Sequence, residues 1–240
     1  MSNKFFRIFT ALLFGIALLA AVSCSKVKNS IETVAAESKD NTTNQQPIAL
    51  PTPATAAKGE QIAVFAGGCF WGLEGVFEHI KGVSDVVNGY SGGAAKTADY
   101  ETVSTGTTGH AESVKITYDP SQVTYEQLLK VFFSVAHDPT ELNRQGPDAG
   151  TQYRSAIFYA NDEQKQQAEN YIAEMTKEKV YAKPIVTQVV PLKAFYKAED
   201  YHQNYLDQHP DQPYIVINDQ PKVENLQKQF PNLYTSKKAT

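Results

Sequence analysis

The stretch from Gln61 to Ile80 limits the possible folds of this chain more than any other. Residues 61–66 are short, apolar and β-branched, which predicts a buried strand. A run of glycines, Gly67 to Gly72, interrupts the pattern, and apolar residues then recur at helical spacing, namely Leu73, Val76, Phe77 and Ile80. The sequence therefore predicts a strand, a glycine-lined turn and a helix that pack together.

Cys69 lies in this predicted turn and is the candidate nucleophile. It is the single cysteine after residue 58, and the neighbouring Trp71 is the single tryptophan of the sequence. Unpaired backbone N–H groups and the positive end of a helix dipole stabilise anions, and a thiolate is an anion. We expect the turn to favour the thiolate. The alternative is that Cys69 is a small buried hydrophobic residue, which is a common fate of a lone cysteine.

The remaining sequence predicts an α+β domain. Strands are expected at 112–118, 155–160 and 185–190, helices at 71–80, 124–135 and 161–179, and a glycine-rich loop at 88–93. Thr124 is a candidate N-cap, as is Asn161 or Asp162. Connections of both hairpin and crossover length favour a two-layer sandwich of a mixed sheet with packing helices. A long irregular C-terminal tail, beyond Tyr205, should wrap the core.

The first 58 residues have a different composition. Lys4 and Arg7 precede an apolar run from Ile8 to Val22, followed by Ser23-Cys24, which is typical of an export signal. Because the cysteine follows small residues, the end of the run resembles the lipobox of bacterial lipoproteins. That resemblance implies removal of residues 1–23, diacylation of Cys24 and attachment to a membrane of the bacterial cell envelope, on the periplasmic face or at the cell surface.

A flexible tether is expected at 24–58, which is rich in Ser, Thr, Asn, Gln, Ala and Pro, with the globular domain at 59–240. From Gly59 onward, 16 Lys and Arg stand against 23 Asp and Glu, a formal charge of −7. That balance argues against a nucleic-acid partner, which would need a basic face. With one cysteine, this domain cannot form an internal disulfide. We expect a monomer.

Polar residues that could surround Cys69 gather at three places in the sequence. Tyr90 lies in the predicted glycine-rich loop, and Glu112 begins a predicted strand. The third group runs from His137 to Ser155 and includes Asp148 and Tyr153. Binding and catalytic residues are often carried by loops that a rigid scaffold positions.

Several of these runs together resemble the A type of peptide methionine sulfoxide reductase. The resemblance extends in order from about Gln61 to Tyr214, and it rests on the runs GCFWG (68–72), GYSGG (89–93), GHAE (109–112), HDPT (137–140), NRQG (143–146), GTQYRS (150–155) and DYHQNYL (200–206). It implies reduction of methionine S-sulfoxide, free and in oxidised proteins, one enzyme serving each sulfoxide epimer.

The chemistry also follows from the residue types. A sulfoxide sulfur becomes electrophilic when its oxygen is protonated or strongly hydrogen-bonded, so a reductase needs a thiolate and an acid. Cys69 and Glu112 fill those roles, and the acid needs a raised pKa. The resemblance implies that Tyr90 and Tyr153 donate hydrogen bonds to the sulfoxide oxygen. It further implies that Phe70 and Trp71 form an apolar wall for the substrate methyl group and that Asp148 orients a water or the polar groups of the pocket.

Each assignment has an alternative. Glu112 alternates with apolar strand residues and could be solvated, and either tyrosine could serve packing alone. A cysteine peptidase or acyltransferase would use Cys69 with His110, His137 or His202 as its base. A lipoprotein that binds a ligand without turnover is the alternative outside enzymology.

Two features concern cofactors. The histidines show no metal-ligand spacing with the cysteine, so we expect no metal. Many relatives carry further cysteines near the C-terminus that attack the sulfenic acid, whereas residues 213–240 contain none. We therefore expect an external thiol, either a small thiol or a thioredoxin-like protein, to regenerate Cys69.

Overall fold

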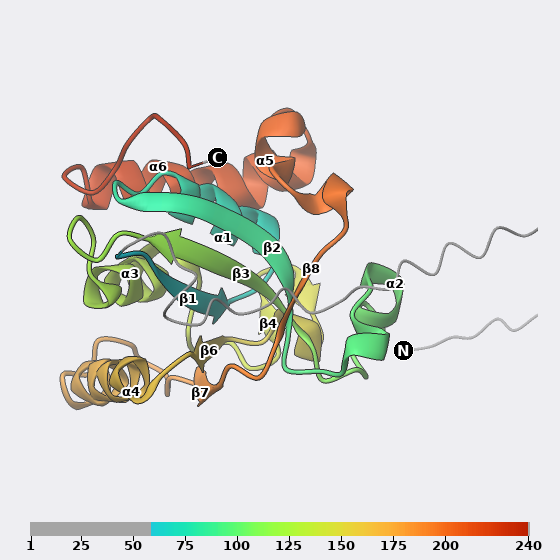
Figure 1. The fold of residues 1–240 in the computed structure, drawn as a ribbon, viewed down its shortest axis with the longest axis horizontal. Helices are drawn as coiled ribbons and strands as arrows, with labels where there is room; N and C mark the ends of the chain where they lie inside the picture. The colour runs from blue at the N-terminus through green and yellow to red at the C-terminus, as the bar shows by residue number, and fades with distance from the viewer. Residues whose placement is uncertain (1–58, 240) are drawn as a thin grey trace, which may run out of the picture. The chain divides into compact units, whose positions relative to one another are not determined.

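The computed structural model describes residues 59–239, and a six-stranded sheet runs through that part of the chain (Figure 1). The strands follow the order β7-β6-β1-β3-β2-β8. Their bounds are β1 Gln61–Ala66, β2 Val83–Ser91, β3 Ala111–Tyr118, β6 Ala156–Tyr159, β7 Gln188–Pro191 and β8 Phe195–Lys197. All neighbours are antiparallel except β6 and β7, which are parallel, so the expected mixed sheet is confirmed.

Helices account for most of the remaining regular structure. The α-helices are α1 Phe70–Glu78, α2 Tyr100–Val103, α3 Tyr125–Val131, α4 Asp162–Lys177, α5 Tyr205–Gln208 and α6 Gln220–Gln229. Shorter helical turns are η1 Ala95–Thr97, η2 Phe132–Ala136, η3 Thr151–Tyr153, η4 Asp200–His202 and η5 Ile215–Asp219, and a two-stranded hairpin pairs β4 Arg144–Gln145 with β5 Asp148–Ala149. The expected helix caps are present: Thr124 forms a capping box with Gln127, and the Asn161 side chain accepts from the Gln164 backbone.

The helices pack on one face of the sheet because β1 alternates its side chains. Phe65 lies in the larger core, where the centroid of its ring is 5.7 Å from the ring centroid of Phe77 in α1 and 4.8 Å from that of Phe132. Val64 and Ala66 point to a smaller cluster on the other face. α1, α3, α4 and α6 all contribute to the larger core. The α+β class and the layered arrangement of sheet and helices are thus confirmed.

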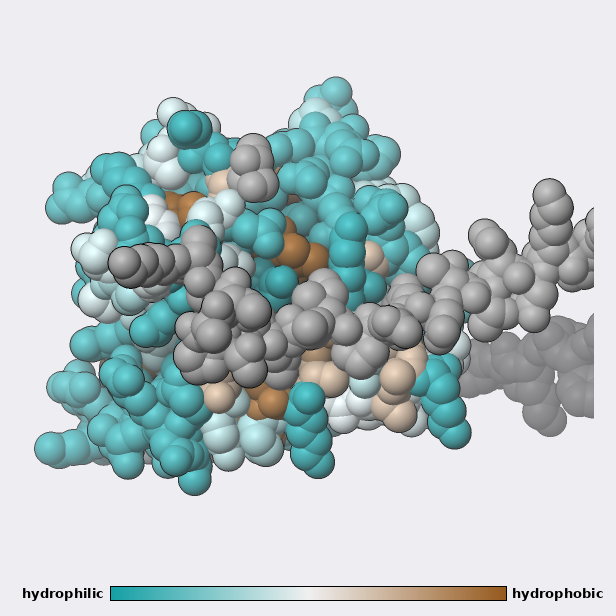
Figure 2. All heavy atoms as spheres, in the orientation of Figure 1, coloured by the Kyte–Doolittle hydropathy of each residue, from teal (hydrophilic) through white to brown (hydrophobic). Residues whose placement is uncertain are grey.

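Figure 1 shows α6 beside α1, and α4 beside β6 and β7. The C-terminal segment therefore returns over the helix that follows Cys69. On the face seen in Figure 2, the coloured side chains are mostly hydrophilic, and hydrophobic atoms show in separate places.

Three sequence-based expectations differ from the structure. Residues 88–91 were expected in a loop, yet they complete β2, because β3 and β8 bind its two edges. The strand β8 was not predicted, since three residues are too few to show a periodicity. The tail wraps the core as expected but is less irregular than expected, because it contains η5 and α6.

The predicted signal, the tether and the lipidation residue Cys24 lie outside the described residues. Within residues 59–239, no helix is both long and apolar enough to cross a membrane.

Candidate active site

Cys69 is the N-cap residue of α1, directly after β1, as the sequence predicts. Its side chain is 7% exposed. Gly68 has φ +99°, a conformation that side chains rarely adopt, and a Cβ there would lie 2.6 Å from Gln145. The absence of a side chain at Gly68 therefore lets the chain turn sharply and lets the β4–β5 hairpin pack against the turn that holds the thiol.

Glu112 lies beside the same turn. It is the second residue of β3 and is 2% exposed, so the alternative of a solvated strand residue is wrong. Its Oε2 accepts a hydrogen bond of 3.1 Å from the backbone N–H of Phe70, the residue that follows Cys69. The start of α1 thus places the thiol and the carboxyl group next to each other.

The electrostatics of Cys69 differ from the expectation that the turn favours a thiolate. The backbone N–H of Trp71 and the Lys222 ammonium do lower the pKa of the thiol. Burial is the dominant influence, and the carboxylates of Glu112 and Asp219 add to it, so the pKa of Cys69 is raised well above its usual value. The resting thiol is protonated at neutral pH.

The electrostatics of Glu112 suit a proton donor. Burial raises the pKa of its carboxyl group to about 8, against the lowering effect of the Phe70 hydrogen bond, and Asp148 and Asp219 raise it further. Below this pH the carboxyl group is largely protonated. A neutral acid therefore lies beside the thiol near pH 7, which is the arrangement that general acid catalysis requires.

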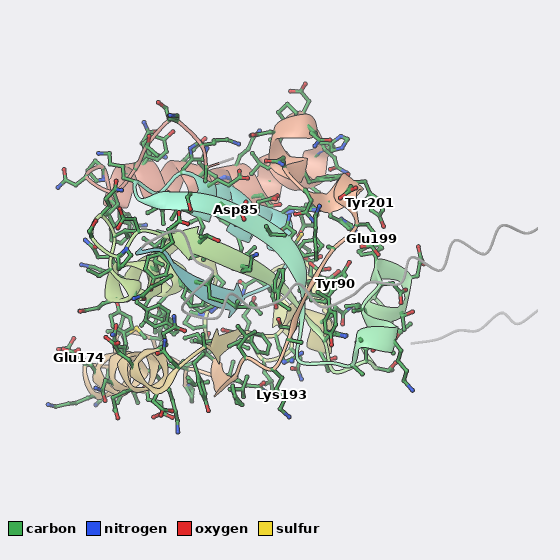
Figure 3. The ribbon with its side chains drawn as sticks, viewed as in Figure 1. Asp85, Tyr90, Glu174, Lys193, Glu199 and Tyr201 are labelled. Carbon is green, nitrogen blue, oxygen red and sulfur yellow. The ribbon has the colours of Figure 1, made fainter. Side chains whose placement is uncertain are left out.

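Tyr90 directly opposes Glu112 in the β2–β3 ladder, so both side chains point to the same face. Its hydroxyl is fully buried and donates to Glu199 Oε2 at 2.9 Å. Glu199 also accepts from the backbone N–H of Tyr100 through its other oxygen. Figure 3 shows Tyr90 close to Glu199, where β2 meets the segment that follows β8. The hydroxyl proton expected at the sulfoxide oxygen is directed to Glu199 instead.

Tyr153 ends the turn η3 and is half-buried. Burial raises the pKa of its hydroxyl, and Glu112, Asp148 and Cys69 raise it further, which places it within the field of the other site groups. The adjacent Arg154 fixes this turn against the start of β3, because its guanidinium donates to the carbonyl oxygens of Gly109 and His110.

Asp148 lies on β5 and accepts a hydrogen bond from the hydroxyl of Tyr214. This contact ties the hairpin to the C-terminal segment. Tyr214 is therefore a site residue that the sequence does not predict, because its pairing with Asp148 joins positions far apart in the chain.

Phe70 and Trp71, which were expected to form an apolar wall for the substrate, differ in exposure. Phe70 is 1% exposed, and its ring lies 5.9 Å from Tyr90. Trp71 is partly exposed, and its ring stacks on that of Tyr205 with 3.8 Å between the ring centroids. Its Nε1 donates a hydrogen bond of 3.2 Å to His202 Nδ1. The partly exposed indole is thus the one able to meet a substrate, and the more deeply buried Phe70 supports it.

Three charged residues of the site were not predicted from the sequence. Glu199 adjoins the run 200–206 and could have been found as its acidic neighbour. Asp219 and Lys222 stand in a stretch with no recognised pattern, and only the fold brings them to α1.

The histidines do not form a nucleophile-and-base pair with Cys69. Both ring nitrogens of His110 are hydrogen-bonded to Gly93 and Ala94, and those of His137 to Phe132 and Ser155. His202 accepts from Trp71, and burial lowers its pKa to about 4. The peptidase or acyltransferase alternative is therefore not favoured. Across residues 59–239, no cluster of three or more His, Cys, Asp or Glu side chains could hold a metal.

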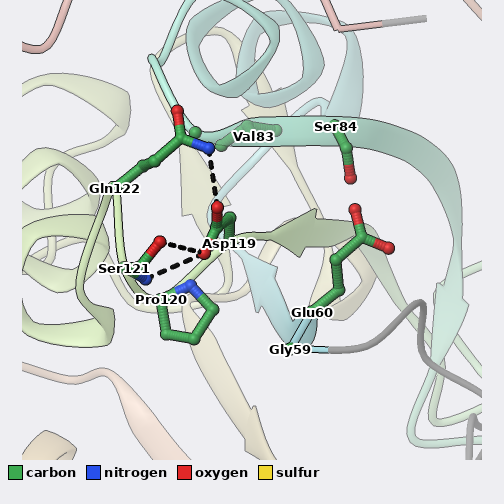
Figure 4. Close-up of a pocket in the computed structure, with 9 residues that line it drawn as sticks. Gly59, Glu60, Val83, Ser84, Asp119, Pro120, Ser121 and Gln122 are labelled. Carbon is green, nitrogen blue, oxygen red and sulfur yellow. Dashed lines mark hydrogen bonds between the residues drawn. The ribbon is translucent and has the colours of Figure 1, made fainter.

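A surface groove of about 640 Å³ lies apart from these groups (Figure 4). Its polar side chains bind one another, Asp119 accepting from Ser121 and Gln122. None of the candidate site residues lines it, and it is lined by Gly59, Glu60, Gly82, Val83, Ser84, Asp119, Pro120, Ser121 and Gln122.

Comparison with known proteins points to one family. Residues 61–234 match the family model described as peptide methionine sulfoxide reductase. The peptide methionine sulfoxide reductase MsrA 2 of Mesorhizobium japonicum is 63% identical over 182 residues, which cover 76% of this chain and 93% of that protein. The MsrA 2 of Synechocystis is 53% identical over 176 residues, or 73% of this chain and 82% of that protein.

Two solved structures are similar in fold. Mxr1 of Saccharomyces cerevisiae in its reduced form is 34% identical with a TM-score of 0.59, over 67% of this chain and 89% of that one. Methionine sulfoxide reductase A of Corynebacterium diphtheriae is 36% identical with a TM-score of 0.56, over 70% of this chain and 83% of that one.

Proposed function

The chain belongs to the peptide methionine sulfoxide reductase family and reduces methionine sulfoxide, and from this premise we propose which of its residues carry out the reaction. Cys69 is the nucleophile, and Glu112 is the acid. The substrate is the S epimer, free or in oxidised proteins, as the resemblance to the A type implies.

In the first step, Glu112 donates its proton to the sulfoxide oxygen while the sulfur of Cys69 attacks the sulfoxide sulfur. Cys69 has lost its thiol proton to solvent before the attack, and Glu112 regains a proton from solvent after it has donated its own. The oxygen, with its proton, then moves to Cys69, and the bond between the two sulfurs breaks with its electron pair on the methionine sulfur. Methionine is released reduced, Cys69 is oxidised to a sulfenic acid, and Glu112 is again protonated.

The other site residues bind and orient the substrate in this proposal. In the described part of the chain, no hydrogen bond engages the Tyr153 hydroxyl, so it is available to the sulfoxide oxygen. Tyr90 shares the face of Glu112 but must leave Glu199 before it can donate there. Asp148, held by Tyr214, orients polar groups, and the indole of Trp71 receives the methyl group.

The observation that carries the proposal is the pairing of a buried thiol at the start of α1 with a buried carboxyl group of β3, which is hydrogen-bonded to the first turn of α1 and has its pKa raised to about 8. The full chain is mixed with one equivalent of methionine sulfoxide and no reductant. Mass spectrometry of the peptide that contains Cys69 should show one added oxygen that dimedone traps, with one methionine released.

Cys69→Ser is the control and should release no methionine. Retained turnover in that variant, or an unmodified Cys69 thiol after methionine release, would contradict the mechanism.

An external thiol completes the cycle. Residues 70–240 contain no second cysteine, and an acylated Cys24 cannot act as a thiol. The thiolate of a small thiol or of a thioredoxin-like protein attacks the sulfur of the sulfenic acid, a disulfide forms, and the oxygen leaves as water after protonation. A second external thiol then reduces the mixed disulfide.

We also propose that diacylation of Cys24 anchors the chain to an envelope membrane, which residues 4–24 support by their charge, apolar run and small residues. Cys24→Ser should then move the protein from the membrane fraction to the soluble fraction. A wild-type chain that is already soluble after cell fractionation would disprove the anchor without affecting the reaction.

A further inference from the structure

An ion pair of the C-terminal segment lies against the helix that begins at Cys69. Asp219 ends η5, Lys222 is the third residue of α6, and Lys222 Nζ lies 3.1 Å from Asp219 Oδ1. The Asp219 side chain is 0% exposed and that of Lys222 is 18% exposed. Asp219 Oδ2 is buried and has no hydrogen-bond partner among residues 59–239. Burying a half-satisfied carboxylate costs free energy, so its position calls for an explanation beyond packing.

The pair rests directly on Gly72 in the first turn of α1. A Cβ at Gly72 would collide with Oδ1 of Asp219 and would lie 2.7 Å from Lys222 Nζ. Since Gly72 is three residues after Cys69, the two charges lie about one helical turn from the nucleophile. They face it through protein, where charges are screened less than in water.

The two charges act on Cys69 with opposite sign. Asp219 raises the pKa of the thiol, and Lys222 lowers it. The titratable and charged groups that surround Cys69 come from six places in the fold, namely Glu112 of β3, Asp219 of η5, Lys222 of α6, Tyr153 of η3, Tyr100 of α2 and Tyr214. Glu112 ionises at about pH 8, below the raised pKa of Cys69, so the carboxylates of Glu112 and Asp219 and the Lys222 ammonium are the charges that act on the thiol as it ionises.

We propose that the Asp219–Lys222 pair sets how readily Cys69 ionises, Lys222 favouring the thiolate and Asp219 opposing it. Both are positioning residues, because neither makes a hydrogen bond with the sulfur of Cys69. The inference rests on the proposed role of Cys69 as the nucleophile.

The balance has a consequence for regulation. The thiolate is the form that oxidants attack, and repeated oxidation beyond the sulfenic acid is irreversible for most proteins. By adding to the effect of burial, Asp219 favours the protonated thiol and so limits this damage in a domain that has no neighbouring cysteine. Lys222 offsets part of the effect of Asp219 on the pKa of Cys69, so the thiol can still ionise and react.

The test measures ionisation of Cys69 in the full chain without using the reductase reaction. Iodoacetamide, a neutral probe, modifies Cys69 at each pH, and mass spectrometry follows the peptide that contains it. In Asp219→Asn the midpoint of the pH profile should fall, and in Lys222→Met it should rise, each by at least about half a pH unit. At a fixed pH below the midpoint, a shift of half a pH unit changes the alkylation rate of Cys69 roughly threefold. The rate should rise in Asp219→Asn and fall in Lys222→Met.

The exposed pair Glu224 and Lys228 of α6, with Nζ and Oε2 3.1 Å apart, provides the matched control. Neither Glu224→Gln nor Lys228→Met should move the midpoint. If Asp219 and Lys222 only held the C-terminal segment in place, both of their variants would expose Cys69 and raise its reactivity together. Shifts in the same direction, or no shift in either variant, would overturn the proposal.

Lys222→Arg keeps the test decisive if Asp219→Asn does not fold. Because arginine retains the positive charge, the midpoint of the Cys69 alkylation profile in Lys222→Arg should equal that of the wild type, whereas the midpoint in Lys222→Met should rise. Equal midpoints in these two variants would overturn the proposal. Because alkylation needs no methionine sulfoxide, a failure here and a failure of the reductase assay are distinguishable.

Discussion

Two parts of the chain, residues 61–118 and residues 195–230, surround Cys69 with different kinds of side chain. The first part provides the groups proposed to react, Cys69 and Glu112, and fixes them through the sheet and the start of α1. The second part provides charges and rings that act from a short distance, such as Asp219, Lys222 and Tyr214.

The two parts are also held differently. β1, β2 and β3 share backbone ladders. The later segment joins that sheet through β8 and meets α1 mainly through side chains, for example in the hydrogen bond from Trp71 to His202. The Glu74 carboxylate of α1 likewise accepts from the backbone N–H of Asn204. Changes to Cys69 or Glu112 should therefore affect the chemical step, and changes in the second part or at its contact with α1 should affect ionisation and stability.

The largest effect is expected from Glu112→Gln. The amide can still accept the bond from Phe70, but it cannot donate a carboxyl proton, so kcat should fall about 10²–10⁴-fold with the fold intact. Glu126→Gln, an exposed change on α3, is the control. A loss below about tenfold would reduce Glu112 to a positioning role.

The pH profile of the same variant gives a second comparison. Below about pH 8 Glu112 stays protonated, so the wild-type rate should rise with pH as Cys69 ionises. Above about pH 8 the gain in thiolate is offset by the loss of the Glu112 proton, and the rate should level off. In Glu112→Gln the rate should keep rising, as measured by single-turnover methionine release.

Gly72→Ala tests the contact between the two parts. In a free helix alanine would be favoured by roughly 1 kcal/mol, yet here its Cβ collides with Asp219. We expect a net loss of about 1–3 kcal/mol in the free energy of unfolding, measured in urea. In an Asp219→Ala background, Gly72→Ala should lower the free energy of unfolding by less than it does in the wild type. An equal loss in the two backgrounds would mean that the alanine methyl group does not clash with Asp219.

Glu74→Gln tests how the buried carboxyl group at the same contact affects stability. Burial raises the pKa of Glu74 from 4.5 to about 8, so its contribution to stability is present below pH 4.5 and is lost as pH rises through about 8. Between pH 6.5 and 8 the stability of the wild type should fall. The variant should reduce this fall by on the order of 1 kcal/mol in denaturant unfolding at the two pH values. An identical pH dependence would show that Glu74 does not titrate there.

Histidines do not obscure this test. Burial lowers the pKa values of His79, His110, His137 and His202, so the stability that the protein gains on their deprotonation is completed just above the unfolded value of 6.5, equally in the wild type and in the variant. Glu78, with a pKa of about 7, and Glu112 contribute to the same fall and remain in the Glu74 variant.

The smallest effect is expected from Tyr214→Phe, which removes the hydrogen bond to Asp148 and keeps the ring beside Trp71. The stability should fall by about 0.5–1.5 kcal/mol, and kcat should change little, because the Tyr214 hydroxyl donates to Asp148 of the hairpin and not to the thiol. A loss of kcat comparable to that of Glu112→Gln would place Tyr214 in the reaction.

The sequence by itself determined the strand–turn–helix around Cys69, the strand that carries Glu112 and the caps of α3 and α4. These features follow from periodicity and from residue types that act within a few positions. The burial of Glu112 could be expected only because its proposed role requires a raised pKa.

The tertiary structure decided the features that join distant residues. It placed Tyr90 on a strand because β8 pairs with β2, and it gave the Tyr90 hydroxyl to Glu199. It also brought Asp219 and Lys222 to Gly72. Burial and the field of nearby charges then reversed the expected ionisation of Cys69, because a pKa depends on the whole surroundings of a group and not on the turn in which it lies.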